Sequence, residues 1–230
     1  MFSDVFLAAT AAELAQFRPK RVAYMACHFS PYGTGLSNMP GFLPPESMLL
    51  LDDSMPPGDH DTSLVAEQLT EIINKFSVKA VLLDFQREKN EKTVQMTSFL
   101  IRALPCPVAA TEPYAMEIGC PVLLSPVPAN VCLQAYLAPW LQQGVYMEIA
   151  PAALQITVTE SGSSAISFKF ADEPPLYSKK ISCHYDVKVE SDKAVFTLTR
   201  TKDDLAVLAQ QAAAMGVHGT VGLYQELTRL

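Results

Sequence analysis

Polar residues, most of them acidic, follow short apolar runs at many points of this 230-residue chain. Asp84 follows Val78–Leu83, for example, and Glu148 follows Val145–Met147. Carboxylates at such places can act together as general acid and base, or they can bind a divalent cation through oxygen. Either chemistry requires a fold that brings them together. The residues at these points are His28, Asp52, Asp53, Asp84, Gln86, Glu112, Ser125, Glu148, Glu160 and Glu226.

The apolar runs themselves predict strands. They are continuous rather than alternating, which is typical of strands that are buried on both faces in a parallel sheet. Before the first of them, Ser3 or Asp4 is expected to cap a short helix that ends at Phe17. The predicted strands are Val22–Cys27, Met48–Leu51, Val78–Leu83, Pro107–Ala110, Pro121–Leu124, Val145–Met147, Leu154–Val158 and Val217–Leu223.

Amphipathic stretches between several of these strands predict helices, and strand–helix–strand at this spacing is the βαβ pattern. We therefore predict an α/β fold, a small and incomplete (β/α)8 TIM barrel that forms one domain over residues 1–230, with loops in place of some crossover helices. An open doubly wound sheet is less favoured, because no GxGxxG follows the first predicted strand. The predicted helices are Asp61–Phe76, Asn90–Leu104, Ala129–Gln143 and Asp203–Met215, and a hairpin is predicted over 182–199.

In such a barrel the carboxyl ends of all strands meet at one mouth, where the polar residues would gather. Glu148, between Met147 and Ile149, is expected to point into the barrel. We predict that Glu148 and Glu112 form the pair of acid and base or nucleophile, and that Asp84 orients the substrate. The other predicted ligand contacts are Asp53, Gln86, His28, Tyr114 and Tyr224. Each has a structural alternative: an acid after a strand often caps the next element, and histidines and tyrosines often belong to the core.

The stretch Val78–Gln86 resembles the third strand of chitinase-like glycoside hydrolases, which carries a run of the type F-D-G-x-D-x-D-F-E. Asp84 and Phe85 match the final D-F. Lys79 and Leu82 stand where two aspartates would be, and Gln86 stands where the catalytic glutamate would be. This resemblance implies a barrel that acts on or binds a carbohydrate.

Two other stretches extend the resemblance over most of the chain. Val22–Phe29 is similar to the opening strand of these barrels, and Gly219–Glu226 is similar to the closing strand, where an aromatic residue forms the floor of the sugar site. Glutamine has no acidic proton to give, so Gln86 cannot serve as the family's general acid. Either the chain is a non-catalytic barrel that recognises a glycan or a protein, or the chemistry has moved to other acids such as Glu112 and Glu148.

A third hypothesis is a divalent-metal hydrolase that uses His28, Asp52 and Glu148. No cofactor is predicted, and the oligomeric state stays open. Nucleic acid is excluded as a partner, because 17 Lys and Arg against 24 Asp and Glu supply no basic face. A membrane span is also excluded, since no apolar run reaches the ~18–20 residues that one needs. The N-terminal stretch does not resemble a secretory signal, and five cysteines without a CxxC pair indicate reduced thiols in the cytoplasm.

Overall fold

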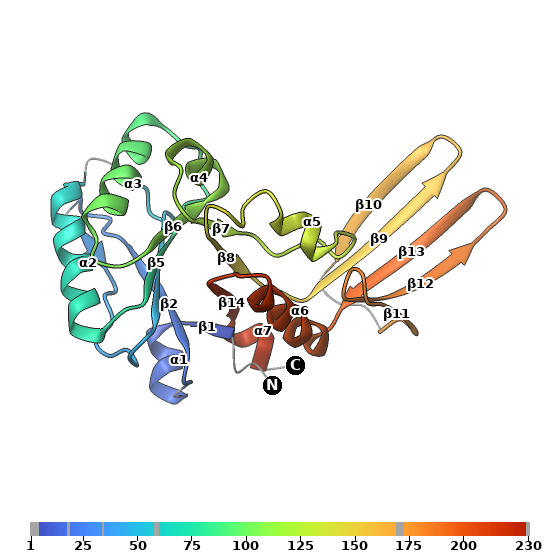
Figure 1. The fold of residues 1–230 in the computed structure, drawn as a ribbon, viewed down its shortest axis with the longest axis horizontal. Helices are drawn as coiled ribbons and strands as arrows, with labels where there is room; N and C mark the ends of the chain where they lie inside the picture. Colours follow the sequence, from blue (N-terminus) through green and yellow to red (C-terminus); the bar gives the residue numbers. More distant parts are fainter. Residues whose placement is uncertain (1–4, 18, 34, 58–59, 169–172, 229–230) are drawn as a thin grey trace.

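The computed structural model describes residues 5–17, 19–33, 35–57, 60–168 and 173–228. Its main part is a closed barrel of eight parallel strands (Figure 1). The ring closes because β1 pairs with β2 on one side and with β14 on the other. This confirms the predicted barrel. Its strands are β1 (Val5–Ala9), β2 (Val22–Phe29), β4 (Met48–Asp52), β5 (Ala80–Asp84), β6 (Val108–Thr111), β7 (Val122–Leu124), β8 (Val145–Glu148) and β14 (Gly219–Leu223).

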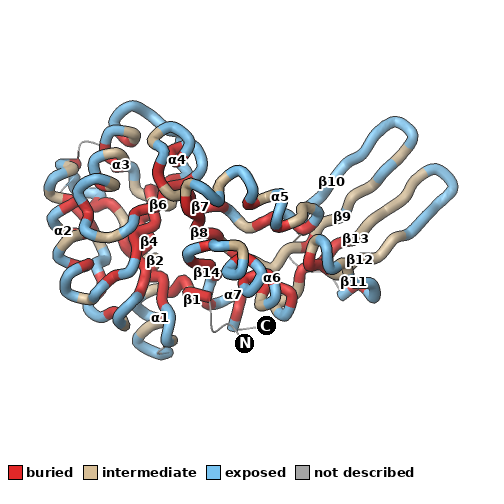
Figure 2. The backbone as a smooth tube through the Cα atoms, viewed as in Figure 1, coloured by how far each residue is buried: buried red, intermediate tan, exposed pale blue. Residues whose placement is uncertain are grey.

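Both faces of the barrel strands are buried, which explains their continuous apolar sequence. Alternate residues, among them Leu50, Leu82 and Tyr146, fill the interior of the barrel. The residues between them, such as Leu49 and Leu83, form a second and larger cluster under the surrounding helices. Figure 2 shows this buried layer along the barrel strands. The alternation decides which residue at the end of each strand faces the interior.

Helices cover the outside of the barrel at most crossovers. Asp61 caps the helix between β4 and β5 by accepting a hydrogen bond of 2.8 Å from the Ser63 backbone. The described residues between β2 and β4 form a loop with the two-residue strand β3 (Leu36–Ser37), so a loop replaces the crossover helix here. The helices are α1 (Ala11–Gln16), α2 (Thr62–Phe76), α3 (Glu91–Ala103), α4 (Glu112–Ile118), α5 (Leu133–Leu137), α6 (Lys202–Ala214) and α7 (Tyr224–Thr228).

The start of the chain differs from the prediction. Residues 5–9 form the first barrel strand rather than part of a helix, and the helix begins only after Thr10, whose side chain makes a capping box with Glu13. The predicted caps Ser3 and Asp4 lie outside the described residues. As a consequence Val22–Phe29 holds the second strand of the barrel instead of the first, and Asp84 ends the fourth strand instead of the third.

A second sheet, antiparallel and five-stranded, is inserted between β8 and α6. The predicted barrel strand Leu154–Val158 is part of this sheet, so that assignment was wrong. Its alternating sequence pairs with a neighbouring strand, as in Ile156 opposite Phe196. The predicted hairpin over 182–199 is confirmed, and two hairpins project away from the barrel (Figure 1). The strands are β9 (Ala152–Thr159), β10 (Gly162–Phe168), β11 (Leu176–Ser178), β12 (Cys183–Val189) and β13 (Lys193–Arg200).

The base of this inserted sheet is fixed to the barrel by Arg200, which is only 2% exposed. Its guanidinium donates hydrogen bonds to four backbone carbonyls on the loop after β7 and on the segment before β12. Four of the five guanidinium N–H groups therefore have an acceptor, which offsets much of the cost of burying the charge. The four carbonyls belong to Val127, Pro128, Ile181 and Ser182. Within the described residues, no helix is both long and apolar enough to span a lipid bilayer.

Candidate site at the barrel mouth

Three carboxylates occupy interior positions where the barrel strands end. Leu50, Leu82 and Tyr146 face the interior, so the residues two positions later in each strand take the same face. These later residues are Asp52, Asp84 and Glu148. The sheet register places Asp52 directly beside Asp84. The mouth of the barrel is therefore lined by acids from its third, fourth and seventh strands.

His28 extends this row on the second strand. It pairs in register with Asp52, beyond an irregularity in β2 that lies between Tyr24 and Cys27. Cys27 itself packs in the outer cluster. Burial, and to a smaller extent the charge of Asp52, raises the pKa of the Cys27 thiol to about 12, so this thiol stays uncharged and is a poor nucleophile. His28, by contrast, is partly exposed and shares the row of Asp52.

Asp84 has a hydrogen-bond donor of its own. Nε2 of Gln86 lies 2.5 Å from its Oδ1. Burial raises the pKa of Asp84, the hydrogen bond from Gln86 lowers it, and the charges of Asp52 and Asp53 raise it further. The amide stabilises the ionised form of Asp84, because its N–H can only donate to that oxygen.

Glu148 lacks such a donor within the described part of the chain. Burial raises its pKa to about 7, with further contributions from the negative charges of Asp84 and Glu226. Among the described residues, none donates a hydrogen bond to its carboxylate and no cation lies within 4 Å of it. A carboxyl group of this kind holds its proton near neutral pH, which is what a general acid requires.

Asp53 holds the neighbouring loops together. It is 3% exposed, and its two carboxylate oxygens accept backbone hydrogen bonds from Gln86 at 2.9 Å and from Arg87 at 3.0 Å. The Arg87 guanidinium returns a bond of 2.6 Å to the Asp53 carbonyl. Asp53 thereby fixes the loop after β5, and with it the position of the Gln86 side chain.

Glu112 lies at the exposed start of α4, after the fifth barrel strand. Tyr136 of α5 lies near both Glu112 and Glu148. Burial raises the pKa of Tyr136, and the negative charges of these two glutamates raise it further. The Tyr136 hydroxyl donates to the carbonyl of Ser125 at 2.9 Å. Sequence reasoning missed Tyr136 as a residue of the mouth, because its helical spacing indicated only a core position.

The two tyrosines that were predicted to contact a sugar are buried. Tyr114 is 1% exposed, and its hydroxyl donates to Thr93 Oγ1 at 2.9 Å. Tyr224 is 7% exposed, and its ring packs against Phe17 with 4.9 Å between centroids. Neither ring presents a face on which a sugar could stack, so we do not include them in the proposed site.

Two other expectations about the mouth are wrong. Glu160 follows β9 in the inserted sheet and not a barrel strand, so it does not belong to the row of acids. The metal hypothesis required His28, Asp52 and Glu148 to converge. No three His, Cys, Asp or Glu side chains of the described ranges are arranged so that they could hold a metal ion.

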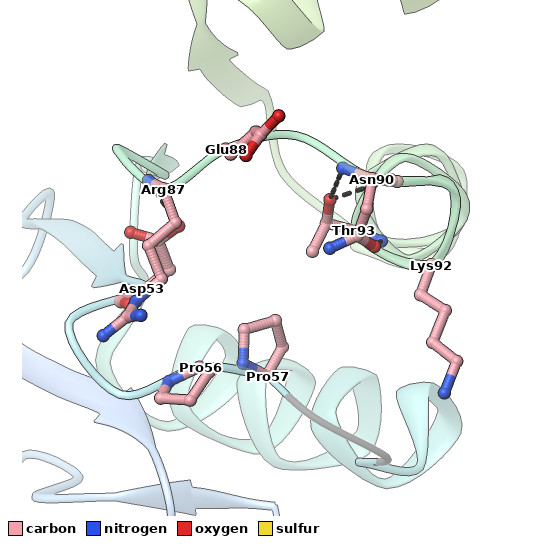
Figure 3. A pocket seen from close by; sticks show the side chains of 8 residues that line it. All are labelled: Asp53, Pro56, Pro57, Arg87, Glu88, Asn90, Lys92 and Thr93. Atoms are coloured by element: carbon pink, nitrogen blue, oxygen red, sulfur yellow. Dashed lines mark hydrogen bonds between the residues drawn. The ribbon is translucent and has the colours of Figure 1, made fainter.

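A cavity of about 500 Å³ lies beside the mouth, between the loops that follow β4 and β5 (Figure 3). Asp53 and Arg87 form one side of it, and Asn90 and Thr93 at the start of α3 form another. A second cavity of about 480 Å³ lies between α1 and the loop after β3, where Phe42 lines it. Sequence reasoning had not indicated either cavity, because each is formed by loops whose course it could not give.

No protein-family model matches the chain, and no curated protein matches its sequence. Solved structures are similar in fold. A family 18 chitinase from Cycas revoluta in complex with allosamidin has a TM-score of 0.56 at 9% identity, over 96% of this chain and 94% of that one.

Two bacterial structures give the same result. A chitinase from Chromobacterium violaceum has a TM-score of 0.52 at 11% identity, with 96% and 93% of the two chains covered. A spore cortex-lytic enzyme from Bacillus cereus has a TM-score of 0.51 at 9% identity, with 96% and 71% covered. At such identity the likeness concerns the fold. The chain has the barrel fold of these chitinases and cortex-lytic enzymes, as the motif around Asp84 led us to expect.

Proposed function

We propose that this protein binds a carbohydrate at the mouth of its barrel and hydrolyses a glycosidic bond, with Glu148 as the general acid. The observation that carries the proposal is the environment of Glu148. It is a partly buried carboxyl group on an interior position at the end of β8, with a pKa raised to about 7. The choice of ligand is supported by a chitinase of similar fold that was solved in complex with (GlcNAc)3.

Asp84 is the proposed partner of Glu148. Glycoside hydrolysis needs one carboxyl group that is protonated and one that is ionised. Gln86 stabilises the ionised form of Asp84, whereas Glu148 receives no such hydrogen bond. The two residues end the fourth and the seventh strand, so a saccharide could lie between them across the mouth. Glu148 would protonate the glycosidic oxygen, and Asp84 would act as base or nucleophile on the other side of the sugar.

The remaining residues of the mouth receive other roles. His28 and Gln86 are proposed to contact the ligand, and Glu112 is proposed to contact it from the exposed start of α4. Asp53 positions Gln86 through the backbone, since both of its carboxylate oxygens are occupied. We also propose a cytoplasmic location, because all five cysteines are free thiols.

The test is a hydrolysis screen on a broad panel of chromogenic glycosides, including chito-oligosaccharides. The wild-type protein is compared with Glu148→Gln, which keeps the shape of the side chain but removes its proton. Glu160→Gln, on the exposed turn of the inserted sheet, is the matched control. We expect Glu148→Gln to lose about 10²-fold or more in kcat and the control to be unchanged. Turnover that does not depend on Glu148, or none on any substrate, would reject the proposed enzyme.

A second candidate is a carbohydrate-binding barrel without catalysis, and Gln86 favours it. A Cycas revoluta chitinase mutant with a glutamate-to-glutamine replacement was solved in complex with (GlcNAc)4, so a barrel of this fold with such a replacement can hold a sugar. Isothermal titration calorimetry with (GlcNAc)4 distinguishes the two functions. Binding that Asp84→Asn weakens, without release of shorter sugars, would select the non-catalytic function.

A further inference from the structure

The last described helix, α7, begins directly after β14 and carries Glu226. β14 lies beside β8 in the barrel, with Val221 in register with Glu148. The backbone of Ile149, the next residue, donates a hydrogen bond of 2.7 Å to the Val221 carbonyl. The strand end that carries Glu148 is therefore tied to the strand from which α7 emerges.

Gly222 allows α7 to approach this strand end closely. A Cβ at position 222 would lie 2.6 Å from Cδ1 of Leu227 and 3.1 Å from the carbonyl oxygen of Ile149. Leu227 is fully buried. From the other side, Nε2 of Gln225 donates to Oε1 of Glu13 at 2.9 Å. These contacts fix α7, and with it Glu226, beside the end of β8.

The carboxylate of Glu226 is poorly satisfied in this place. Its Oε2 is buried and has no hydrogen-bond partner among the described residues. Within the same residues, no Lys, Arg or His side chain lies within 4 Å of the Glu226 or Glu148 carboxylates. A buried carboxylate without donor or cation is costly, and a pair of such groups lowers the cost by keeping one proton.

Burial and the charge of Asp84 raise the pKa of Glu148 more than Glu226 does, but the other titratable neighbours each have a partner or solvent for their own polar groups. Asp84 of β5 has the amide of Gln86 as a donor. The Tyr136 hydroxyl of α5 donates its hydrogen bond to the Ser125 carbonyl. Glu112 of α4 is exposed to solvent. Among these neighbours, Glu226 is the one with a buried oxygen that lacks a donor.

We infer that Glu226 is a positioning residue for Glu148: its carboxylate, fixed by α7 beside the end of β8, keeps one proton on Glu148 at neutral pH. Glu148 would thus already be protonated, and ready to act as an acid, when a sugar binds. The contribution of Glu226 to the raised pKa of Glu148 agrees with this assignment. The role of this proton in catalysis rests on the proposed function. The retention of the proton by Glu148 does not depend on it.

The test is a titration of side-chain carboxyl carbons by NMR on the full-length protein labelled with ¹³C. In Glu226→Gln the amide replaces the carboxylate at equal size, and we expect the midpoint of Glu148 to fall by about one pH unit. Glu160→Gln is the control, and it should leave the midpoint in place. A midpoint that is unchanged in Glu226→Gln overturns the inference.

A measurement on the wild-type protein keeps the test valid if Glu226→Gln does not fold. The Glu148 resonance should show two inflections, since a carboxyl group that interacts with a second one titrates in two steps. A single transition of the Glu148 resonance would overturn the inference.

The pH profile of kcat/KM separates this inference from the proposed function. If the protein turns over a substrate, we expect Glu226→Gln to move the basic limb of the kcat/KM profile to lower pH, with little change in KM. Turnover with an unmoved limb would reject the role of Glu226 and leave the proposed enzyme standing. A shifted NMR midpoint without turnover on any substrate would reject the enzyme and leave the role of Glu226 standing.

Discussion

The side-chain amide of Gln86 donates a hydrogen bond of 2.5 Å to Oδ1 of Asp84, the residue that ends β5. Glu148, which ends β8, receives no hydrogen bond from the described part of the chain. Burial raises the pKa of both acids of the mouth, but the hydrogen bond from Gln86 offsets part of the rise in Asp84, whereas Glu148 has no such donor among the described residues. Asp53 maintains this difference, because it fixes the backbone of Gln86.

Replacing Gln86 by glutamate tests the first half of this relationship. Gln86→Glu removes the donor from Asp84 and places a like charge beside it, so the pKa of Asp84 should rise. We expect a loss of about 1 kcal/mol in the free energy of unfolding at pH 8, measured with urea. The loss should disappear below about pH 4, where acidic groups of ordinary pKa become protonated.

Gln95→Glu provides the matched control for this prediction. Nε2 of Gln95 donates to Oε1 of Glu91 at 3.1 Å, which is also an amide–carboxylate pair, but Glu91 is exposed whereas Asp84 is partly buried. Solvent screens that pair, so its replacement should cost less. Equal losses in the two variants would contradict a special role for the bond between Gln86 and Asp84.

The second prediction concerns the pH dependence of stability. The pKa of Glu148 is raised from 4.5 to about 7 in the folded protein, so the folded state binds more protons than the unfolded state between these values. This contribution to stability is present below pH 4.5 and is lost as the pH rises through about 7. Glu148→Gln removes the ionisable group, so the variant should gain about 1–3 kcal/mol relative to wild type between pH 5 and pH 8.

Urea unfolding of wild type and Glu148→Gln at both pH values measures this change. Asp61→Asn is a useful reference, because Asp61 is exposed at the start of α2. A difference between wild type and Glu148→Gln that stays constant with pH would mean that Glu148 titrates normally.

The third prediction concerns the attachment of the inserted sheet. Arg200→Met keeps much of the apolar stem but removes the donors from the carbonyls of Val127, Pro128, Ile181 and Ser182. Unsatisfied buried carbonyls cost about 1–3 kcal/mol each when water cannot replace the donor. We expect a loss of about 3 kcal/mol or more and faster amide exchange in β12 and β13. Lys188→Met, at an exposed position of β12, is the control and should lose less than about 0.5 kcal/mol.

The sequence predicted the architecture because both faces of each barrel strand are buried, which leaves a run of apolar residues such as Val145–Met147. The prediction failed where a stretch rich in apolar residues belongs to an element other than the one assigned to it. Val5–Ala9 merges with the apolar residues of α1 and was therefore interpreted as helix. Leu154–Val158 was grouped with the barrel strands although Gln155 and Thr157 alternate with its apolar residues, and its partner is β13. Alternation is typical of a strand with one buried face, so this pattern indicated a separate antiparallel sheet, but the partner strand is distant in sequence and could not be predicted.

The acids of the mouth were predictable for the same reason. Asp84 and Glu148 each end an apolar run, and the alternation of a strand turns them inward. The role of a tyrosine was not predictable, because an aromatic ring with a hydroxyl suits the core and a ligand site equally. Tyr114 and Tyr224 proved to be buried. The sequence also could not predict that Oε2 of Glu226 lacks a hydrogen-bond partner among the described residues, because this depends on the packing of α7.

The last prediction tests that packing through Gly222→Ala. The backbone φ of Gly222 is not in the left-handed region, so the substitution adds only a methyl group, which meets Leu227 and the carbonyl of Ile149. We expect α7 to shift, the free energy of unfolding to fall by about 1–3 kcal/mol, and the NMR midpoint of Glu148 to fall as Glu226 moves away. Gly41→Ala is the matched control, because nothing lies within 4 Å of its added Cβ. If Gly222→Ala destabilises the protein while the Glu148 midpoint stays in place, α7 stabilises the fold without acting on the acid.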